Sequence, residues 1–480
     1  MPIQKHRNVS GIPRRVFLQA TTGTMAVLPA MTAATAAETV VPPFAPRRKD
    51  CAIKCAFVFP PTESLRQAGY YSWPGSGFDA EGHRREYSAR LGQFERTLGI
   101  SIKTHGVALD DEASAVAFAE EVKQTKPDGL LLVLLKKGHW PRVKHIVETT
   151  EVPAVVYAPL GVLLVDHINE ARQMAGLHLI SSEEVDTVEP ALRMLRAAAW
   201  MRQSRILNID GAETKTTVVP HLGTEVLSVP HERFYAQYDD TKPDDAVRAL
   251  AAAYAHNAKD IVEPNNEDIQ DAARCYFALR RVADAENADA LMMNCLPGLQ
   301  HPRKHVPPCM AFMNLRDQGL PAGCQSDLNA TLTLLLVQYL FDRPGFQQNA
   351  SMDTAQNLYF GAHCTCPSHM NGTDTPPEPY VLRSHAEAGW GCVPRVLLTK
   401  GQEATIAQYV TGDVPKMYVY TGSIVDCPES VGGCRTNVQM TINEVDDVRN
   451  VKGMHQIVFY GNRGRELREY CQLHGIEAVA

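Results

Sequence analysis

Hydrophobic and polar positions follow two alternating periods along the first third of the folded chain. Continuous apolar runs at 129–135 and 152–160 predict strands that are covered on both faces. Apolar residues at helical spacing between positions 87 and 98, followed by Gly99, predict a helix that ends at this glycine. Strands that alternate with helices in this way indicate a doubly wound parallel sheet, which we expect over residues 50–170.

The same alternation continues through the middle of the chain. Short apolar runs at 177–180, 205–210 and 290–295 predict strands, with helical spacing between them. Residues 328–341 are almost entirely apolar and predict a buried segment. We therefore expect a second α/β domain over residues 171–345.

The pattern changes in the last third of the chain. Prolines interrupt residues 376–379, and short strand-like runs separated by turn residues follow them. This spacing is typical of an antiparallel barrel or sandwich. We expect a β-rich domain over residues 346–480, with a terminal helix near 466–474 that ends at Gly475.

The first residues of the chain carry an export pattern. Arg14 and Arg15 precede a short Ala/Thr-rich run, which closes on the small residues 34–37. This arrangement predicts a twin-arginine signal peptide over residues 1–37 and a periplasmic or extracellular destination. No later segment reaches eighteen continuous apolar residues, so the sequence predicts no membrane span.

Composition and charge narrow the class of partner. The formal net charge is −7 and no basic run stands out, which argues against a nucleic-acid surface. The chain contains 12 cysteines, and export permits disulfides. Cys51 with Cys55, and Cys427 with Cys434, are close enough in sequence to bridge across a loop, but the pairing stays open. No CxxC pair is present, so a structural zinc ribbon is not expected.

Two distant polar residues are the main candidates for chemistry. Asp327 stands just before the apolar segment 328–341, and His455 stands just before an aromatic run at 456–460. A carboxylate and an imidazole from remote parts of a chain can form half of a divalent-metal site. Each residue also has a simpler explanation, because Asp327 is expected to cap a helix and His455 could be a packed histidine.

Several segments together resemble one enzyme superfamily. The segments at 323–329 and 453–464 resemble metal-site segments of the L-fucose isomerase and L-arabinose isomerase superfamily, and the resemblance is best over about 290–366. The resemblance implies two α/β domains followed by a β-rich domain, and aldose–ketose isomerisation through an enediol. It further implies a Mn²⁺-like ion with Asp327 and His455 as ligands, a monosaccharide substrate, and a homo-oligomer, either a trimer or a hexamer.

The sequence lacks two acidic residues that this superfamily uses to bind its metal ion and to transfer the proton. Gln325 occupies a position where relatives carry an acid, and the strand that ends near Cys295 is followed by no acid. Asp327 and His455 alone would hold manganese weakly. A third ligand could come from Cys295, His301 or His363, and a thiolate or a further imidazole would favour zinc.

A second group of residues is expected to line a sugar pocket. The segment 385–389 resembles a pocket segment of the superfamily, which makes Glu387 a candidate site acid, although it could equally be a solvated loop carboxylate. Trp390 could stack on a sugar ring. His363 and Gln325 are candidate substrate-binding residues, and core packing is the alternative for His363.

Three functions are compatible with these observations. The first is a metal-dependent sugar isomerase or a diverged variant of it. The second is an exported glycoside hydrolase that uses Asp327 and Glu387 as its two carboxyl groups. The third is a non-catalytic sugar-binding protein, which would retain the pocket and lose the acids that transfer protons.

Overall fold

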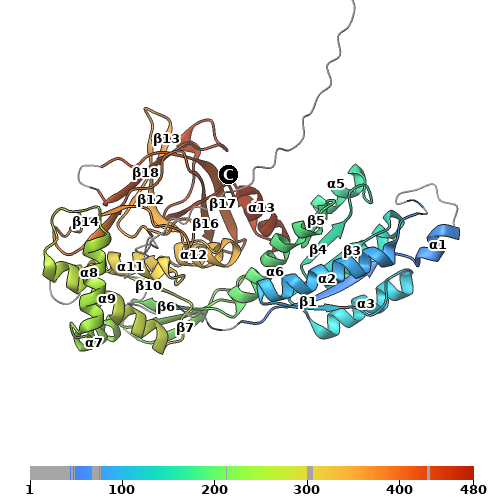
Figure 1. Cartoon of the computed structure of the whole chain (residues 1–480), viewed down its shortest axis with the longest axis horizontal. Coiled ribbons are helices and arrows are strands. Elements are labelled where there is room, and N and C mark those ends of the chain that lie inside the picture. The colour runs from blue at the N-terminus through green and yellow to red at the C-terminus, as the bar shows by residue number, and fades with distance from the viewer. Residues whose placement is uncertain are drawn as a thin grey trace, which may run out of the picture.

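The computed structural model describes residues 44, 47, 49–67, 75, 77–211, 213–299, 306–429 and 433–480. Two α/β domains and a β-barrel follow one another along the chain, and the first domain extends to one side of the other two (Figure 1). The predicted signal peptide lies outside the described residues. Among the residues that are described, we find no helix with both the length and the apolar character that a bilayer crossing requires.

The first domain is a five-stranded parallel sheet with the strand order β2-β1-β3-β4-β5. Its strands are β1 (Ala52–Val58), β2 (Ser101–Thr104), β3 (Gly129–Leu134), β4 (Ala154–Ala158) and β5 (Leu177–Ser181). Its helices are α1 (Thr62–Gln67), α2 (Ala80–Leu98), α3 (Glu112–Thr125), α4 (Trp140–Thr150) and α5 (Val165–Gln173), with short 3₁₀ turns at Lys137–His139 and Val185–Thr187.

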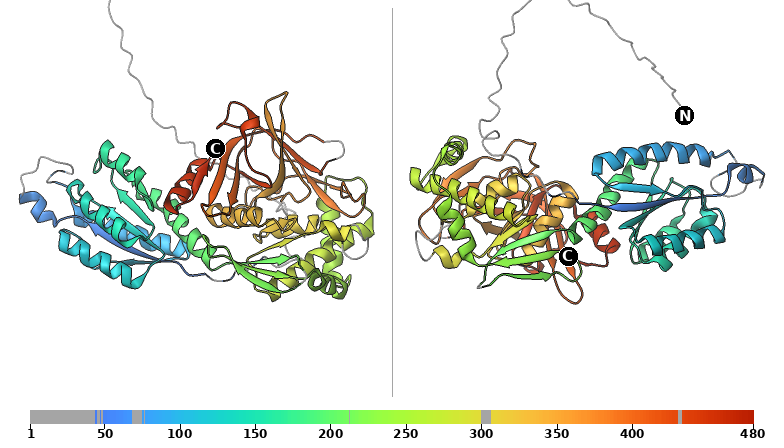
Figure 2. Two further views of the ribbon diagram at one scale, coloured as in Figure 1. Left: turned by 180° about the vertical axis from the view of Figure 1, so that it is seen from behind. Right: turned by 90° about the horizontal axis from the view of Figure 1, so that it is seen from below.

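Alternate side chains of each strand pack on opposite faces of this sheet, as expected for a doubly wound fold. Phe57 and Tyr157 belong to the core on the α2 side, whereas Val58 and Val156 belong to the core with α3 and α4. The views in Figure 2 show helices on both faces of the sheet. Helix α2 ends at Gly99 in a left-handed conformation, where the sequence predicts its end.

One predicted strand belongs to a different domain from the one that the sequence indicates. β5 pairs in parallel with β4 and completes the first sheet, whereas its position after residue 170 places it in the predicted second domain. The following helix, α6 (Val188–Arg202), then connects the first domain to the second and packs against α12 (Leu328–Phe341). Local periodicity predicts a strand, but it does not determine which sheet accepts it.

The second domain is a mixed sheet with the order β11-β10-β6-β8-β7, in which only β7 runs antiparallel to its neighbour. Its strands are β6 (Arg205–Ile209), β7 (Lys215–Val218), β8 (Glu225–Val229), β10 (Ala290–Met293) and β11 (Ala322–Cys324). Its helices, apart from α12, are α7 (His231–Asp240), α8 (Asp245–Asn257), α9 (Asn266–Ala285), α10 (Leu296–Leu299) and α11 (Cys309–Asp317).

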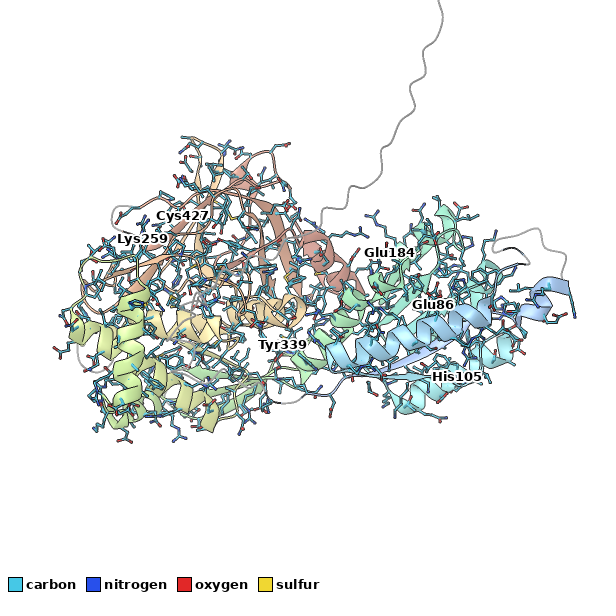
Figure 3. All side chains as sticks on the ribbon, in the orientation of Figure 1. Glu86, His105, Glu184, Lys259, Tyr339 and Cys427 are labelled. Atoms are coloured by element: carbon cyan, nitrogen blue, oxygen red, sulfur yellow. The ribbon has the colours of Figure 1, made fainter. Side chains whose placement is uncertain are left out.

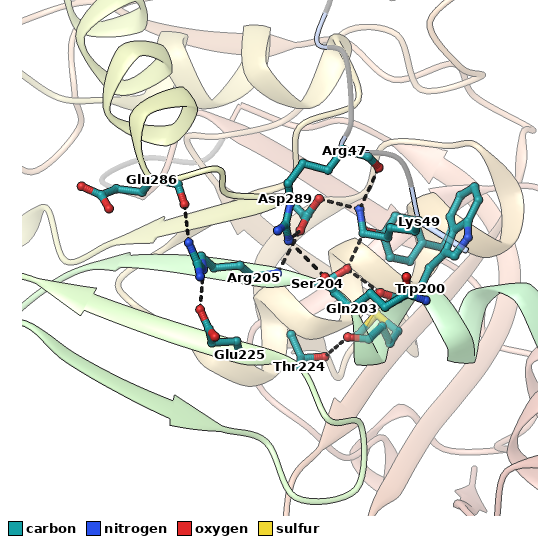
Figure 4. Close-up of polar contacts among 12 residues, drawn as sticks. Arg47, Lys49, Trp200, Gln203, Ser204, Arg205, Thr224, Glu225, Glu286 and Asp289 are labelled. Carbon is teal, nitrogen blue, oxygen red and sulfur yellow. Dashed lines mark hydrogen bonds and ion pairs between the residues drawn. The ribbon is translucent and has the colours of Figure 1, made fainter. Parts of the chain in front are cut away.

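A buried carboxylate holds the segment before β1 against the second domain (Figure 4). Asp289 is 2% exposed and accepts hydrogen bonds from Lys49 Nζ and Arg47 Nη2, each at 2.5 Å. It also accepts a hydrogen bond from the backbone N–H of Arg205 at 2.9 Å. A buried charge is tolerated when it is paired and hydrogen-bonded in this way, so the three donors link β6, β10 and the chain that enters β1.

The C-terminal domain is a closed six-stranded barrel, because β16 pairs with both β17 and β19. The barrel strands are β12 (Phe346–Asp353), β13 (Leu358–His363), β16 (Glu403–Val410), β17 (Lys416–Asp426), β18 (Thr436–Met440) and β19 (Gln456–Tyr460). Further elements are α13 (Gly464–Leu473), β20 (Glu477–Val479), which pairs with β17, a 3₁₀ turn at Val448–Asn450, and a small sheet of β9 (Asp260–Ile261), β14 (Tyr380–Arg383) and β15 (Val393–Val396).

Arg316 on α11 joins the second domain to the barrel. It is 2% exposed, and its guanidinium donates to the carbonyls of Ala322 (2.5 Å) and Thr365 (2.5 Å) and, at 3.4 Å, to that of Gly345. Burial lowers the pKa of Arg316 to about 10. Backbone carbonyls from three segments thus share one planar donor group, which fixes the turn after β13 next to the start of β11.

Candidate functional site

Asp327 lies at the start of α12, in the turn that follows β11. Its Oδ1 accepts a hydrogen bond from the backbone N–H of Ala330 at 2.8 Å, which caps the helix as the sequence predicts. Gln325 and Ser326 precede it with φ values of 57° and 51°. Two consecutive non-glycine residues in the left-handed region are strained, so this turn is held by its surroundings rather than by local preference.

His455 pairs with Asp327 across the boundary between the second domain and the barrel. Its Nδ1 lies 2.7 Å from Asp327 Oδ2, and the two residues are 128 positions apart. Because a carboxylate oxygen only accepts, Nδ1 carries the proton, and Nε2 of the neutral ring presents a lone pair. This Nε2 is buried and has no hydrogen-bond partner among the described residues. Asp327 therefore fixes both the tautomer and the direction of the ring.

His363 at the end of β13 is the second imidazole of the site. Its ring centroid lies 6.1 Å from that of His455, with a steep angle of 65° between the planes. Its Nδ1 accepts a hydrogen bond from the backbone N–H of Cys364 at 2.9 Å, so Nε2 is the protonated nitrogen of the neutral ring. That Nε2 is buried without a well-directed hydrogen bond within the described part of the chain.

Two glutamines of the barrel, Gln348 and Gln456, face each other on the paired strands β12 and β19, and Gln456 directly follows His455. Gln348 on β12 donates to the Tyr359 hydroxyl (2.8 Å), which in turn donates to Gln456 Oε1 (2.7 Å). Gln348 Oε1 is buried without a described partner. A Cβ on Gly361 would lie 1.7 Å from this oxygen, so the glycine provides the space that Gln348 occupies. The Ser326 hydroxyl is also buried without a described partner.

Two thiols close the side of the site that faces the second domain. Cys295 follows β10 and Cys324 ends β11, on neighbouring parallel strands. A hydrogen bond with Cys295, together with burial, raises the pKa of Cys324 well above its ordinary value, although His363 next to it acts in the opposite direction. Cys324 is therefore a neutral thiol near pH 7, which makes it a poor nucleophile and a poor metal ligand.

The described residues do not fit the manganese ion that the sequence suggests. Both carboxylate oxygens of Asp327 are already engaged, one by the helix cap and the other by His455. Within the described ranges, no group of three or more His, Cys, Asp or Glu side chains could hold a metal. His301, a candidate third ligand, lies outside the described residues.

The other predicted site residues lie in a neighbouring turn. His385, Glu387 and Trp390 share a compact loop in which the His385 N–H donates to the Trp390 carbonyl at 3.1 Å. The Glu387 side chain is exposed and acts electrostatically on His385 and Cys434. Trp390 is half-buried against the core of the second domain and barrel. No hydrogen bond or ion pair between described residues joins Glu387 to Asp327, so the carboxyl pair expected for hydrolysis is not in direct contact.

Two clefts lie away from this site. One has a volume of about 420 Å³ and lies beside the carboxyl ends of β4 and β5, where it is lined by Glu86 and Glu184 (Figure 3). The other, of about 580 Å³, lies between α4, α6 and α13 and is lined largely by apolar side chains. Neither cleft includes Asp327, His455 or His363. The sequence gives no signal for Gln348, and it singles out the segment that holds Ser326 without giving this residue a role, because both roles depend on strand pairing and on the turn before α12.

Comparisons with known proteins give no family for this chain. No family model matches it, and no curated protein matches it. Solved structures with partial similarity include an ABC-transporter solute-binding protein from Burkholderia multivorans (13% identity, 54% of this chain and 86% of that chain), a LacI-type transcriptional regulator from Bacteroides fragilis (11%, 61% and 91%) and a periplasmic sugar-binding protein from Pseudomonas fluorescens (14%, 61% and 79%). The TM-score is 0.17 in each case, so no conclusion about function rests on them.

These findings correct the family expected from the sequence. No family model and no curated protein supports the resemblance to the L-fucose and L-arabinose isomerases. That assignment is wrong. The description as an isomerase is wrong with it, whereas the manganese ion stays an untested prediction that the described residues do not fit. The motif around Asp327 is explained by its helix cap and its contact with His455.

Proposed function

We propose that this protein binds a small polyhydroxylated ligand of the monosaccharide class at the junction between the second domain and the barrel. The observation that carries the proposal is the set of buried polar atoms without described partners around the Asp327–His455 pair, namely Ser326 Oγ, Gln348 Oε1 and His455 Nε2. Buried polar atoms in folded proteins are normally satisfied by a partner. A bound ligand would supply that partner.

The chemistry of these atoms, together with that of the neighbouring His363 Nε2, favours a ligand with several hydroxyl groups. His455 Nε2 and Gln348 Oε1 accept hydrogen bonds, His363 Nε2 donates, and the Ser326 hydroxyl can do either. A sugar hydroxyl both donates and accepts, so a single sugar can satisfy acceptors and donors that lie side by side. Neutral hydroxyl groups suffice for these contacts, because Asp327 Oδ2 already accepts a hydrogen bond from His455 Nδ1.

Binding without catalysis accounts for this arrangement better than hydrolysis does. Glycoside hydrolysis needs two carboxyl groups on either side of the scissile bond. Asp327 is engaged by its cap and by His455, and Glu387 is exposed on a separate turn. The export predicted from residues 1–37 would suit a protein that captures sugars outside the cytoplasm, and it remains part of the proposal.

Calorimetric titration of the purified chain with a panel of free aldoses and ketoses tests this function. We expect one sugar to bind with a defined stoichiometry, and His455→Ala and His363→Gln to weaken binding at least about tenfold, the loss expected when a buried polar pairing is broken. Asp244→Asn is a matched control for Asp327→Asn, because Asp244 caps α8 by the same contact and has no histidine partner. Absence of binding by the whole panel, or equal binding by the histidine variants, would refute the proposal.

A further inference from the structure

Three cysteines from separate parts of the chain meet beside the site. Cys309 begins α11, Cys364 follows β13 and Cys434 precedes β18, and the three pack with Val393 into one small cluster. Cys364 stands in the middle, because its thiol forms hydrogen bonds with both Cys309 and Cys434. Its sulfur also accepts a hydrogen bond from the backbone N–H of Arg435 at 3.4 Å. We refer to Cys309, Cys364 and Cys434 as the thiol cluster.

The barrel strands bring two of these thiols to one edge. β13 and β18 run antiparallel, with His363 opposite Thr436. Cys364 and Cys434 therefore extend the same strand pair, on the two chain segments that lead away from it. Cys309 and Cys364 are buried, whereas Cys434 is partly exposed. The sequence suggests a bridge between Cys434 and Cys427, but the described structure brings Cys434 to Cys364 instead.

We infer that the thiol cluster is a disulfide-exchange site, in which Cys434 reacts with an incoming disulfide and Cys364 resolves the product into an intramolecular Cys364–Cys434 bond. All described cysteines are thiols in this structure, so the oxidant is an external disulfide of the glutathione or dithiol-oxidase class. The inference rests on the contacts within the cluster and does not depend on the proposed ligand.

The exchange balances in two steps. The hydrogen bond with Cys364 and burial raise the pKa of the Cys434 thiol above its ordinary value, so the exchange is slow near pH 7 and faster at alkaline pH. The Cys434 thiolate attacks one sulfur of the external disulfide, an S–S bond breaks, and one external thiol leaves with the proton that Cys434 has given up. Cys364 then attacks the Cys434 sulfur, and the second external thiol leaves with the proton from Cys364. The protein loses two electrons and two protons, and the external disulfide gains both. Cys309, in contact with Cys364, can exchange into the new bond by the same chemistry.

A disulfide within the thiol cluster would affect the candidate ligand site, because Cys364 directly follows His363. Its backbone N–H holds His363 Nδ1, so a bond from Cys364 to Cys434 constrains the segment that orients this imidazole. The cluster thus lies close enough to the candidate ligand site for its redox state to alter ligand affinity.

Oxidised glutathione, added to the purified reduced chain, tests the inference by non-reducing peptide mapping in a mass spectrometer. We expect a peptide pair that links Cys364 with Cys434, and a smaller amount that links Cys309 with Cys364. Cys434→Ala should abolish both linkages, because it removes the one thiol of the cluster that the oxidant can reach, and Cys309→Ala should leave the Cys364–Cys434 linkage in place. Cys471→Ala is the control, because Cys471 is buried in α13 without a thiol neighbour among the described residues.

Two results would overturn the inference. One is a chain in which all three cysteines of the cluster stay reduced while a model dithiol peptide in the same tube is oxidised. The other is a stable glutathione adduct on Cys434 that Cys364 does not resolve. Cys309→Ala also decides, because the inference requires the Cys364–Cys434 linkage to form without Cys309, and its loss in that variant would overturn the inference.

Discussion

Asp327 Oδ2 lies 2.7 Å from His455 Nδ1, so the first residue of a helix in the second domain is bound to the residue that precedes a barrel strand. One carboxylate performs two tasks, because its other oxygen caps α12. The pair therefore links two domains at the point where the carboxyl ends of β10 and β11 meet the barrel. This position is where ligands commonly bind in open α/β sheets.

The two tasks of Asp327 can be separated by substitution. Asp327→Ala removes both the cap and the contact with His455, and we expect it to lower the free energy of unfolding by about 2 kcal/mol, about 1 for each interaction. Asp327→Asn keeps a capping oxygen and should lose only about half of that. Urea unfolding measures both values. Equal losses in the two variants would show that the cap contributes nothing, and no loss in Asp327→Asn would show that the contact with His455 contributes nothing.

Arg316 is expected to be among the most sensitive positions for stability. Arg316→Met leaves the carbonyls of Ala322 and Thr365 buried without their donor, at a cost of about 1–3 kcal/mol for each group. We therefore expect a loss of about 3 kcal/mol or more in urea unfolding. Arg465→Met is the control, because the Arg465 side chain is 87% exposed and a change within about 0.5 kcal/mol is expected there. A small effect at Arg316 would contradict its role as a link between domains.

The Asp289 network makes a separate prediction for the segment before β1. Asp289→Ala leaves Lys49 and Arg47 without their carboxylate, and removal of one partner of a buried ion pair costs about 3–5 kcal/mol. Asp245→Ala, at a fully exposed ion pair, should change stability by less than about 1 kcal/mol. Limited proteolysis should also cut before residue 50 faster in Asp289→Ala. An unchanged cleavage rate would show that this segment is held by other contacts.

A partly buried histidine predicts how stability depends on pH. Burial lowers the pKa of His474 from 6.5 to about 3. The unfolded chain therefore binds a proton below pH 6.5 that the folded chain does not. Stability is fully present above pH 6.5 and falls as the pH drops toward 3, by up to about 1.4 kcal/mol per unit. His474→Gln should flatten this slope in urea unfolding between pH 6.5 and 4. The same slope in wild type and variant would refute the prediction.

Two glycines should respond oppositely to the same substitution. A Cβ on Gly361 would lie 1.7 Å from Gln348 Oε1, so Gly361→Ala displaces Gln348 and should destabilise the protein by about 1–3 kcal/mol. Gly92 lies within α2 with nothing near its Cβ position, so Gly92→Ala should stabilise the protein by about 0.5–1 kcal/mol. The change in melting temperature of each variant relative to the unchanged protein measures the two effects. A neutral Gly361→Ala would mean that Gln348 moves away at little cost.

The sequence by itself determined the elements whose signal is local. The run at β3 predicts a strand because each of its residues is buried on one face of the sheet or the other. Gly99 and Asp327 mark helix ends because a cap depends on residues within one turn. These interactions join near neighbours along the chain, so their pattern is readable without a structure.

Only the tertiary structure decided what depends on strand order and register. It placed β5 in the first sheet, closed the barrel through β16, brought Cys364 to Cys434, and set Gln348 beside the two histidines. It also showed that both carboxylate oxygens of Asp327 accept hydrogen bonds, one from the helix N-terminus and the other from His455. Short motifs around a capping aspartate and a glycine-rich turn reflect local geometry, and such geometry recurs in unrelated proteins. The resemblance therefore pointed to the wrong family, because the long-range contacts that define a site are not encoded in any one segment.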